Sequence, residues 1–332
     1  MFQVIDSKKL VLVATALVAF FSLIFQTIAL AQEWPTRPVR FLLGLSPGSG
    51  SDLLARSMAQ RLSVVWGKPV VVENRPGANT ILATEVVARA VPDGHTILFA
   101  LDGAFTINPH LYGKLSYDPL RDFSPIAMLT IFPTVLVAHP SVAAANLPEL
   151  IALAKKTPGK LTYGSWGAGS QAHLVQEMLN FRAGIDIAHV PYKGIPQMTT
   201  ATLAGEVALC WVGVFTSRPL VQSGRVRAIA TSGNKRSPLM PEVPSLVELG
   251  FPEAEMSTWY ALFAPTGTPR SIVEKIYADV MKLMTDPEFR ERDMMSKGYE
   301  PSTLTPDELG VYIRREFVAR APIVKVSGAK PE

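Results

Sequence analysis

The stretch Leu45-Ser46-Pro47-Gly48-Ser49-Gly50-Ser51-Asp52 decides the fold. An apolar run at residues 39–45 leads into it and predicts a buried strand, and apolar residues four apart at 52–65 predict an amphipathic helix after it. Strand, glycine-rich loop and helix in this order are typical of an α/β fold. Ser51 or Asp52 stands where the helix N-cap is expected. The N–H groups and positive dipole end of such a helix make the loop a candidate anion site.

A second stretch of the same kind lies about 120 residues further on. It reads Gly164-Ser165-Trp166-Gly167-Ala168-Gly169-Ser170, and it separates a short predicted strand at 161–163 from an amphipathic helix at 171–181. Two loops of this design in the two halves of one chain predict that a ligand is held between them.

Length and composition indicate a globular protein with room for two domains. The chain has 332 residues, of which 48% are hydrophobic and 18% charged. Its formal net charge of +4 is too small and diffuse to predict nucleic-acid binding. The five histidines show no metal-ligand spacing, so we predict neither a metal nor a cofactor.

The N-terminal segment, residues 1–31, is predicted to be a signal peptide. Lys8 and Lys9 precede an apolar run at 10–30, and Ala29-Leu30-Ala31 is a small-x-small cleavage signal. We expect cleavage after Ala31; the alternative is an uncleaved membrane anchor. Cys210, the single cysteine, cannot form an intramolecular disulfide and is expected in the core. An exported protein without disulfides points to a bacterial periplasm.

The rest of the chain alternates between predicted strands and helices, which favours an α/β fold with largely parallel sheets. No flexible linker separates the halves, so two apolar runs, 129–137 and 256–263, are the predicted crossings between lobes and would form a hinge. The C-terminal part, from residue 269 onward, is predicted to be mainly helical.

Several short motifs, spread in order over the exported chain, resemble the solute-binding receptors of tripartite tricarboxylate transporters, also called Bug (Bordetella uptake gene) receptors. The motifs are Trp34-Pro35-Thr36-Arg37-Pro38, Pro47-Gly48 with Ser51-Asp52, Glu73-Asn74-Arg75-Pro76-Gly77, Pro92-Asp93-Gly94-His95, Tyr117-Asp118-Pro119, Val190-Pro191-Tyr192-Lys193-Gly194, Pro241-Glu242-Val243-Pro244 and Ala264-Pro265-Thr266-Gly267. Each motif is weak alone, but their common order is specific.

The resemblance implies a two-lobed periplasmic binding protein fold, type II-like, with two crossings between the lobes. Residues 32–130 and 261–332 would form lobe 1, and 131–260 would form lobe 2. It also implies a monomeric receptor that holds a small organic carboxylate in the cleft and delivers it to the large and small membrane subunits of a secondary transporter. No enzymatic activity is implied.

The expected ligand-binding residues come from the two loops and their neighbours. They are Ser46, Gly48, Ser49, Gly50, Ser51, Asn79, Thr80, Phe105, Ser165, Trp166, Gly169, Ser170, His173 and Tyr192. Hydroxyls and backbone N–H groups suffice for an anion. We interpret Asp52 as a loop organiser, because it would repel an anion, and Trp211 as a core residue. For His173 and Tyr192, packing beside the loops is the alternative.

The chain departs from the family pattern near the expected cleft. Gly48-Ser49-Gly50, Asn79-Thr80, Trp166 and Ala208 stand where the family commonly has other residues. These departures concern the identity of the ligand. Trp166 and Phe105 favour a planar, aromatic carboxylate, and aliphatic di- and tricarboxylates remain open.

Two functions from other classes fit parts of the sequence. One is a sensing module that presents the bound carboxylate to a membrane histidine kinase. The other is an α/β hydrolase, because Gly44-Leu45-Ser46-Pro47-Gly48 has the spacing of a nucleophile elbow. Against the hydrolase, Pro47 has no N–H to offer an oxyanion hole. The first loop also lacks the Gly-Lys-Ser/Thr of a Walker loop and the glycine spacing of a dinucleotide site.

Overall fold

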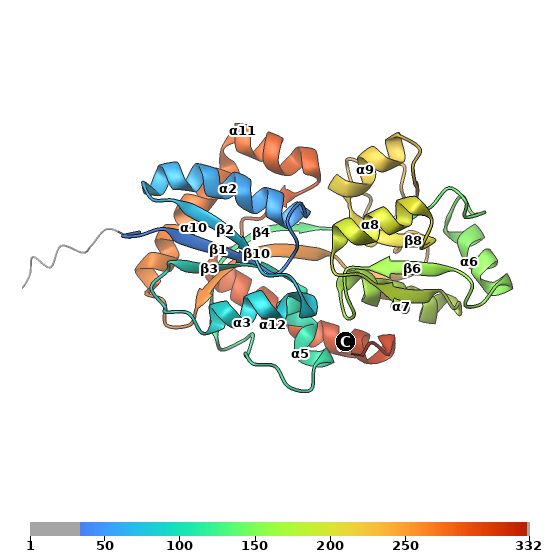
Figure 1. Cartoon of the computed structure of the whole chain (residues 1–332), viewed down its shortest axis with the longest axis horizontal. Helices are drawn as coiled ribbons and strands as arrows, with labels where there is room; N and C mark the ends of the chain where they lie inside the picture. Colours follow the sequence, from blue (N-terminus) through green and yellow to red (C-terminus); the bar gives the residue numbers. More distant parts are fainter. Residues whose placement is uncertain (1–33, 331–332) are drawn as a thin grey trace, which may run out of the picture. The chain divides into compact units, whose positions relative to one another are not determined.

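The computed structural model describes residues 34–330 (Figure 1). By its contacts the chain divides into Met1–Thr36 and Arg37–Glu332, and the second unit holds the helices and strands described below. The predicted signal peptide and its cleavage site lie outside the described residues. Within residues 34–330, no helix is both long and apolar enough to cross a lipid bilayer.

The first of two sheets has the strand order β11-β4-β10-β3-β1-β2. Its strands are β1 (Val39–Leu43), β2 (Val70–Asn74), β3 (Thr96–Leu101), β4 (Phe123–Phe132), β10 (Thr258–Pro265) and β11 (Glu300–Pro301). β1 pairs in parallel with β2 and β3, whereas β10 runs antiparallel to both β3 and β4. We call this sheet and the helices packed on it the first lobe.

Helices cover both faces of the first sheet (Figure 1). They and the short helical turns are α2 (Gly50–Trp66), η1 (Ala78–Thr80), α3 (Ile81–Ala88), α4 (Gly103–Thr106), α5 (Asn108–Leu111), α10 (Arg270–Thr285), α11 (Pro287–Phe289), η3 (Arg290–Met294), η4 (Met295–Lys297) and α12 (Pro306–Ser327). α2 contacts β1, β2 and α10, while α3 and α12 contribute to one hydrophobic core on the opposite face. Thr305 caps α12 in a capping box with Glu308.

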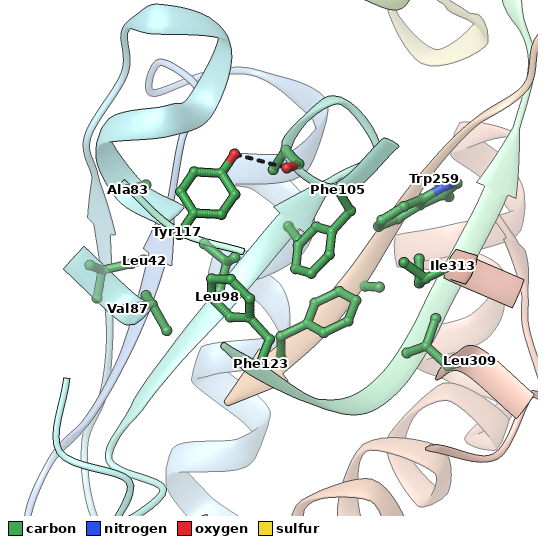
Figure 2. Packing of buried hydrophobic residues seen from close by; sticks show 14 of the residues in the cluster. Leu42, Ala83, Val87, Leu98, Phe105, Tyr117, Phe123, Trp259, Leu309 and Ile313 are labelled. Carbon is green, nitrogen blue, oxygen red and sulfur yellow. Dashed lines mark hydrogen bonds between the residues drawn. The ribbon is translucent and has the colours of Figure 1, made fainter. Parts of the chain in front are cut away.

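Phe105 lies at the centre of that core (Figure 2). Its side chain is fully buried and stacks on Phe263 with ring centroids 4.1 Å apart, and Phe123 meets it edge-on at 5.1 Å. Tyr117 closes the cluster by donating a 2.8 Å hydrogen bond to the carbonyl of Ala104. Each buried phenyl ring stabilises the fold by roughly 1.5–3 kcal/mol.

The second sheet has the order β7-β6-β8-β5-β9. Its strands are β5 (Thr134–Ala138), β6 (Thr162–Ser165), β7 (Ala188–Pro191), β8 (Leu209–Gly213) and β9 (Arg227–Thr231), and its helices are α6 (Leu147–Lys156), α7 (Gln171–Ala183), α8 (Ile195–Ala204) and α9 (Val214–Gln222), followed by the short turn η2 (Pro252–Ala254). We call this part the second lobe. Cys210 is buried in β8 and Trp211 is fully buried beside it, as expected.

The chain passes between the two sheets twice, at the predicted places. β4 ends at Phe132 and β5 begins at Thr134, so only Pro133 separates the sheets on the way out. The return passes through Ser257 into β10. The crossing strands β5 and β10 run against their neighbours, so the expectation of largely parallel sheets is wrong: both sheets are mixed. The reason is the direction of the chain. β5 and β10 begin at the hinge and run away from it, whereas the strands that lead into the two loops end at the hinge.

Candidate functional site

The first loop ends in a serine cap. Ser49, rather than Ser51 or Asp52 as predicted, is the N-cap of α2, and its Oγ accepts the backbone N–H of Asp52 at 3.4 Å. The Ser51 hydroxyl lies 3.0 Å from that of Ser49, and both residues are buried. Gly48 has a φ of 80°, a conformation that favours glycine. The result is a buried pair of hydroxyls at the positive end of a 17-residue helix.

Asp52 organises this loop. Its carboxylate accepts the N–H of Gly48 at 2.9 Å and the guanidinium of Arg56 at 3.0 Å. Burial acts to raise the pKa of Asp52, but the hydrogen bonds from Arg56, Gly48 and Asn74 outweigh it and hold the pKa below its usual value. The charge of Asp52 is therefore compensated inside the loop, which agrees with the interpretation of Asp52 as a loop organiser.

The second loop repeats the same geometry in the second lobe. Ser170 caps α7 with φ −67° and ψ 160°, against −69° and 160° for Ser49, and its Oγ accepts the N–H of His173 at 3.4 Å. Gly167 and Gly169 have φ values of 134° and 71°. The φ of Gly169 favours glycine, and a Cβ there would also overlap the side chain of Leu111 in the first lobe.

Two histidines hold the second loop from behind. His173 Nδ1 accepts the N–H of Gly169 at 3.0 Å, and His189 Nε2 lies 2.7 Å from the Ser165 hydroxyl. Burial, together with the neighbouring His189, lowers the pKa of His173 to about 3, and burial lowers that of His189 to about 4. Both rings are neutral near pH 7. His173 thus supports the loop as a hydrogen-bond acceptor and brings no positive charge to an anion.

A third segment joins the two loops. Ala78, Asn79 and Thr80 have φ values of 45°, 45° and 74°, a left-handed run that L-residues rarely adopt. Asn79 Nδ2 donates to the carbonyl of Gly169 in the second lobe at 3.1 Å and to Asn108 Oδ1 at 2.7 Å. Asn79 Oδ1 and Thr80 Oγ1 are buried and lack hydrogen-bond partners. Backbone strain and unpaired buried polar atoms are typical of binding sites.

A small cavity lies between the lobes, beside these segments. Its volume is about 20 Å³, room for a single water. It is lined by Leu45, Gly50, Leu101, Phe132, Thr134, Trp166, Ile195, Gly213, Thr216, Thr258, Tyr260 and Tyr299. Trp166 is only 7% exposed, and its Nε1 has no hydrogen-bond partner. The buried indole N–H is therefore a hydrogen-bond donor without an acceptor, which a ligand oxygen could supply.

Sequence reasoning missed Tyr260 and Tyr299 in the cavity wall. A Cβ at Gly50 would overlap the Tyr299 hydroxyl and would lie 3.5 Å from that of Tyr260, so both phenols reach the N-terminus of α2. Burial raises the pKa of Tyr299 to about 12 and raises that of Tyr260 well above its usual value, so both hydroxyls stay protonated. The predicted crossing at 256–263 contained Tyr260, but nothing local to Tyr299 connects it with a loop 250 residues away.

The structure gathers most of the expected site residues at the two loops and the cavity. Ser46 lies across from Gly194 in the second lobe, where a Cβ would come within 2.8 Å of the Ser46 hydroxyl. Tyr192 is half-buried and packs beside Gly164, where the second loop begins. Phe105 is the exception, because it lies in the core of the first lobe and not in the cavity wall.

Comparison with known proteins gives concordant matches. Residues 54–328 match the model of the tripartite tricarboxylate transporter family receptor. A UPF0065 protein of Bordetella pertussis is 36% identical over 91% of this chain and 93% of its own length, and Protein BugT of the same species is 33% identical over 90% and 92%.

Solved structures agree with these matches. R. palustris Rpa4515 with adipate has a TM-score of 0.86 and 30% identity over 90% of this chain and 100% of that one. The periplasmic binding protein BugD has a TM-score of 0.84 and 31% identity over 90% and 100%. MatC from Rhodopseudomonas palustris with bound malate has a TM-score of 0.82 and 28% identity over 88% and 100%.

Proposed function

Because the chain belongs to the receptor family of tripartite tricarboxylate transporters, as its sequence predicted, we propose that it captures a small organic carboxylate between its lobes. It then delivers the ligand to the large and small membrane subunits of such a transporter. Adipate and malate in two related structures support this ligand class. The two-lobed fold agrees with that of BugD, a periplasmic binding protein.

The observation that carries the proposal is the pair of matched helix N-termini. Ser49 in the first lobe and Ser170 in the second cap their helices with nearly the same backbone angles. The Asn79–Gly169 hydrogen bond ties the loops together across the lobes. A carboxylate between two helix N-termini would meet free N–H groups and two positive dipole ends. The carboxylate of Asp52 does not compete for these groups, because it is already paired with Arg56.

The proposed contacts are neutral donors. Trp166 Nε1 and Thr80 Oγ1 are buried and unpartnered in the structure, which suits them to ligand oxygens. The full proposed set is Ser46, Gly48, Ser49, Gly50, Ser51, Asn79, Thr80, Ser165, Trp166, Gly169, Ser170, His173 and Tyr192, with His173 acting through its loop. Hydrogen bonds to an anion contribute roughly 1.5–3 kcal/mol each, so neutral donors give binding that is firm yet reversible.

Ligand entry requires the lobes to part. The cavity of about 20 Å³ admits one water, and a carboxylate of four or more carbons needs several times that volume. Opening about Pro133 and Ser257 would widen it. Phe132, Trp166, Tyr260 and Tyr299 supply an aromatic wall, which fits an aromatic or an aliphatic dicarboxylate.

The remaining parts of the proposal follow from this role. The receptor is a monomer of the periplasm, released by cleavage after Ala31, and its lobes are residues 32–130 with 261–332, and residues 131–260. It is not an enzyme. Ser46, at the centre of the elbow-like spacing, is followed by Pro47, which offers no oxyanion N–H.

The test is a thermal-shift screen of residues 32–332 with malate, adipate, terephthalate and citrate, and with the monoamide of each hit. At about 100 times the dissociation constant a ligand adds about 2.7 kcal/mol of stability, a shift of several degrees. The proposal expects a hit that its amide loses. If the screen is silent, mass spectrometry of the denatured protein shows whether a carboxylate has co-purified; silence with no co-purified carboxylate contradicts the proposal.

A further inference from the structure

A chain of four buried hydroxyl groups runs from the N-terminus of α2 to the cavity between the lobes. Ser49 Oγ lies 3.0 Å from Ser51 Oγ, and Ser51 is hydrogen-bonded to the phenol of Tyr260. Tyr260 is in turn hydrogen-bonded to the phenol of Tyr299, with the two ring centroids 5.6 Å apart. Each of the four residues is 3% exposed, so the chain is shielded from solvent.

The protons of this chain point away from the helix. Four hydroxyl groups joined by three hydrogen bonds use three of their four protons, so one proton is left at one end of the chain. Ser49 Oγ accepts the backbone N–H of Asp52 at the positive end of α2, which directs its oxygen toward the helix and its proton toward Ser51. Each following hydroxyl then donates to the next, and the proton that remains is that of Tyr299.

The pKa shifts of the two phenols agree with this direction. Burial raises the pKa of Tyr260 well above its usual value; the hydrogen bond with Tyr299 adds to the rise, as it does for a donor, and the one with Ser51 opposes it, as it does for an acceptor. Burial raises the pKa of Tyr299 to about 12, and the hydrogen bond with Tyr260 opposes that rise. Tyr299 is therefore the acceptor of the bond between them.

The Tyr299 hydroxyl thus reaches the cavity with its own proton unused. Within residues 34–330, Tyr260 is the only hydrogen-bond partner of this hydroxyl. A Cβ at Gly50 would overlap the hydroxyl, and Gly50 and Tyr299 both line the cavity. Trp166 of the second lobe lines it too, and its buried Nε1 also lacks a partner. None of the lining residues is charged, so two neutral donors from different lobes await an acceptor there.

We propose that Tyr299 is a ligand-binding residue whose hydroxyl donates to the carboxylate held between the lobes, beside the indole N–H of Trp166. Tyr260 is a positioning residue, because it orients and polarises the Tyr299 O–H. The inference deepens the proposed receptor function and rests on it. It also specifies the group that is recognised: a carboxylate offers only acceptors to the two donors, whereas a primary carboxamide would direct an N–H at one of them.

The experiment compares binding in variants that lack one phenol hydroxyl. The parent, Tyr299→Phe, Tyr260→Phe and the double variant are titrated calorimetrically near pH 7 with malate, adipate, terephthalate and citrate, and with any carboxylate found to co-purify. Tyr117→Phe is the matched control, because Tyr117 is also a buried phenol, but one that donates to the carbonyl of Ala104 in the core. Urea titrations of the ligand-free proteins measure what each lost hydroxyl costs the fold.

Tyr299→Phe is expected to raise the dissociation constant roughly 10- to 100-fold, as the loss of one hydrogen bond to a charged group predicts. Tyr260→Phe should raise it about threefold in the parent and should have no effect in Tyr299→Phe, because it acts only through the Tyr299 hydroxyl. Tyr117→Phe should leave affinity unchanged. An equal effect of Tyr260→Phe in both backgrounds overturns its positioning role.

A fluorinated residue keeps the proposal falsifiable if Tyr299→Phe does not fold. 3-Fluorotyrosine in place of Tyr299 is nearly isosteric and a stronger hydrogen-bond donor, so it should lower the dissociation constant. A Tyr299 that only packs against Phe132 would not respond to donor strength. If the parent binds a carboxylate and the variants at position 299 bind it equally well, this inference is overturned and the receptor function stands. If the parent binds none and none co-purifies, the receptor function fails and the inference fails with it.

Discussion

The imidazole rings of His173 and His189 are stacked, with centroids 3.8 Å apart and planes 10° apart. Each ring holds a different part of the second loop, through Gly169 N–H and the Ser165 hydroxyl respectively. Two imidazolium ions cannot occupy this position without repelling each other, and a protonated His173 Nδ1 would no longer accept from Gly169. The geometry of the second loop therefore depends on both rings being neutral.

This dependence predicts that acid loosens the second lobe. The folded-state pKa values of about 3 for His173 and about 4 for His189 lie below the unfolded value of about 6.5. Their contribution to stability is full above pH 6.5 and is lost progressively as pH falls toward 4. The free energy of unfolding, from urea titrations at pH 5.0 and 7.5, should fall less in His189→Gln than in the parent. Comparing the two proteins cancels the contributions of the other titrating groups to the pH dependence of the free energy of unfolding.

His139, which is partly buried and hydrogen-bonded to Ser141, provides the control for that comparison. His139→Gln alters a ring with no role in the second loop and should keep the parent's pH dependence. Equal pH dependence in the parent and His189→Gln would contradict the neutral-pair interpretation.

Gly44 is predicted to be intolerant of even a methyl group. A Cβ there would lie 2.7 Å from Thr80 Cα, and backbone cannot yield as a side-chain tip can. Gly44→Ala should lower the free energy of unfolding by about 1–3 kcal/mol and weaken carboxylate binding, because Thr80 must move. Chemical denaturation and ligand titration measure the two effects.

Gly113→Ala is the matched substitution, since a Cβ there meets no atom within 4 Å. It should change stability by less than about 0.5 kcal/mol and leave binding unchanged. If the two alanine variants prove alike, Thr80 is not held where the structure places it.

The indole N–H of Trp166 is predicted to donate to the bound carboxylate. Trp166→Phe keeps a ring in the cavity wall but removes the donor, so the dissociation constant should rise by roughly 10- to 100-fold, the equivalent of one hydrogen bond to a charged group. Calorimetric titration with the best ligand from the screen measures it. Trp259→Phe removes another unpartnered buried Nε1, but in the core cluster, and should leave affinity unchanged. Equal affinities in the parent and Trp166→Phe would exclude this contact.

The elements around the loops could be read from the sequence because local patterns specify them. The helix predicted at 52–65 is Gly50–Trp66, and the strand predicted at 134–138 is Thr134–Ala138. Both follow from hydrophobic periodicity, which acts over a few residues. The two-lobed fold and the family were also predicted, from motifs in a shared order.

The errors concern relationships between distant residues. Phe105 closely follows a strand, a position that is compatible with the edge of a cleft. Its ring instead packs in the core against Phe123 and Phe263, which belong to other strands. Tyr299 reaches Gly50 only because the chain returns to the first lobe after residue 257. The left-handed backbone at Asn79 could not be predicted from the sequence either, because it depends on hydrogen bonds to distant residues such as Asn108 and Gly169.

The position of β10 between β3 and β4 has a consequence for the order in which the two sheets can form. Both neighbours of β10 are complete by Phe132, but the strand that joins them, Thr258–Pro265, emerges more than a hundred residues later. The second sheet needs only residues 134–231, so it can be assembled while the first still has a gap at its centre. The lobe in the middle of the chain is thus built from one continuous segment, whereas the lobe that begins the chain is complete only when the C-terminal segment has joined it.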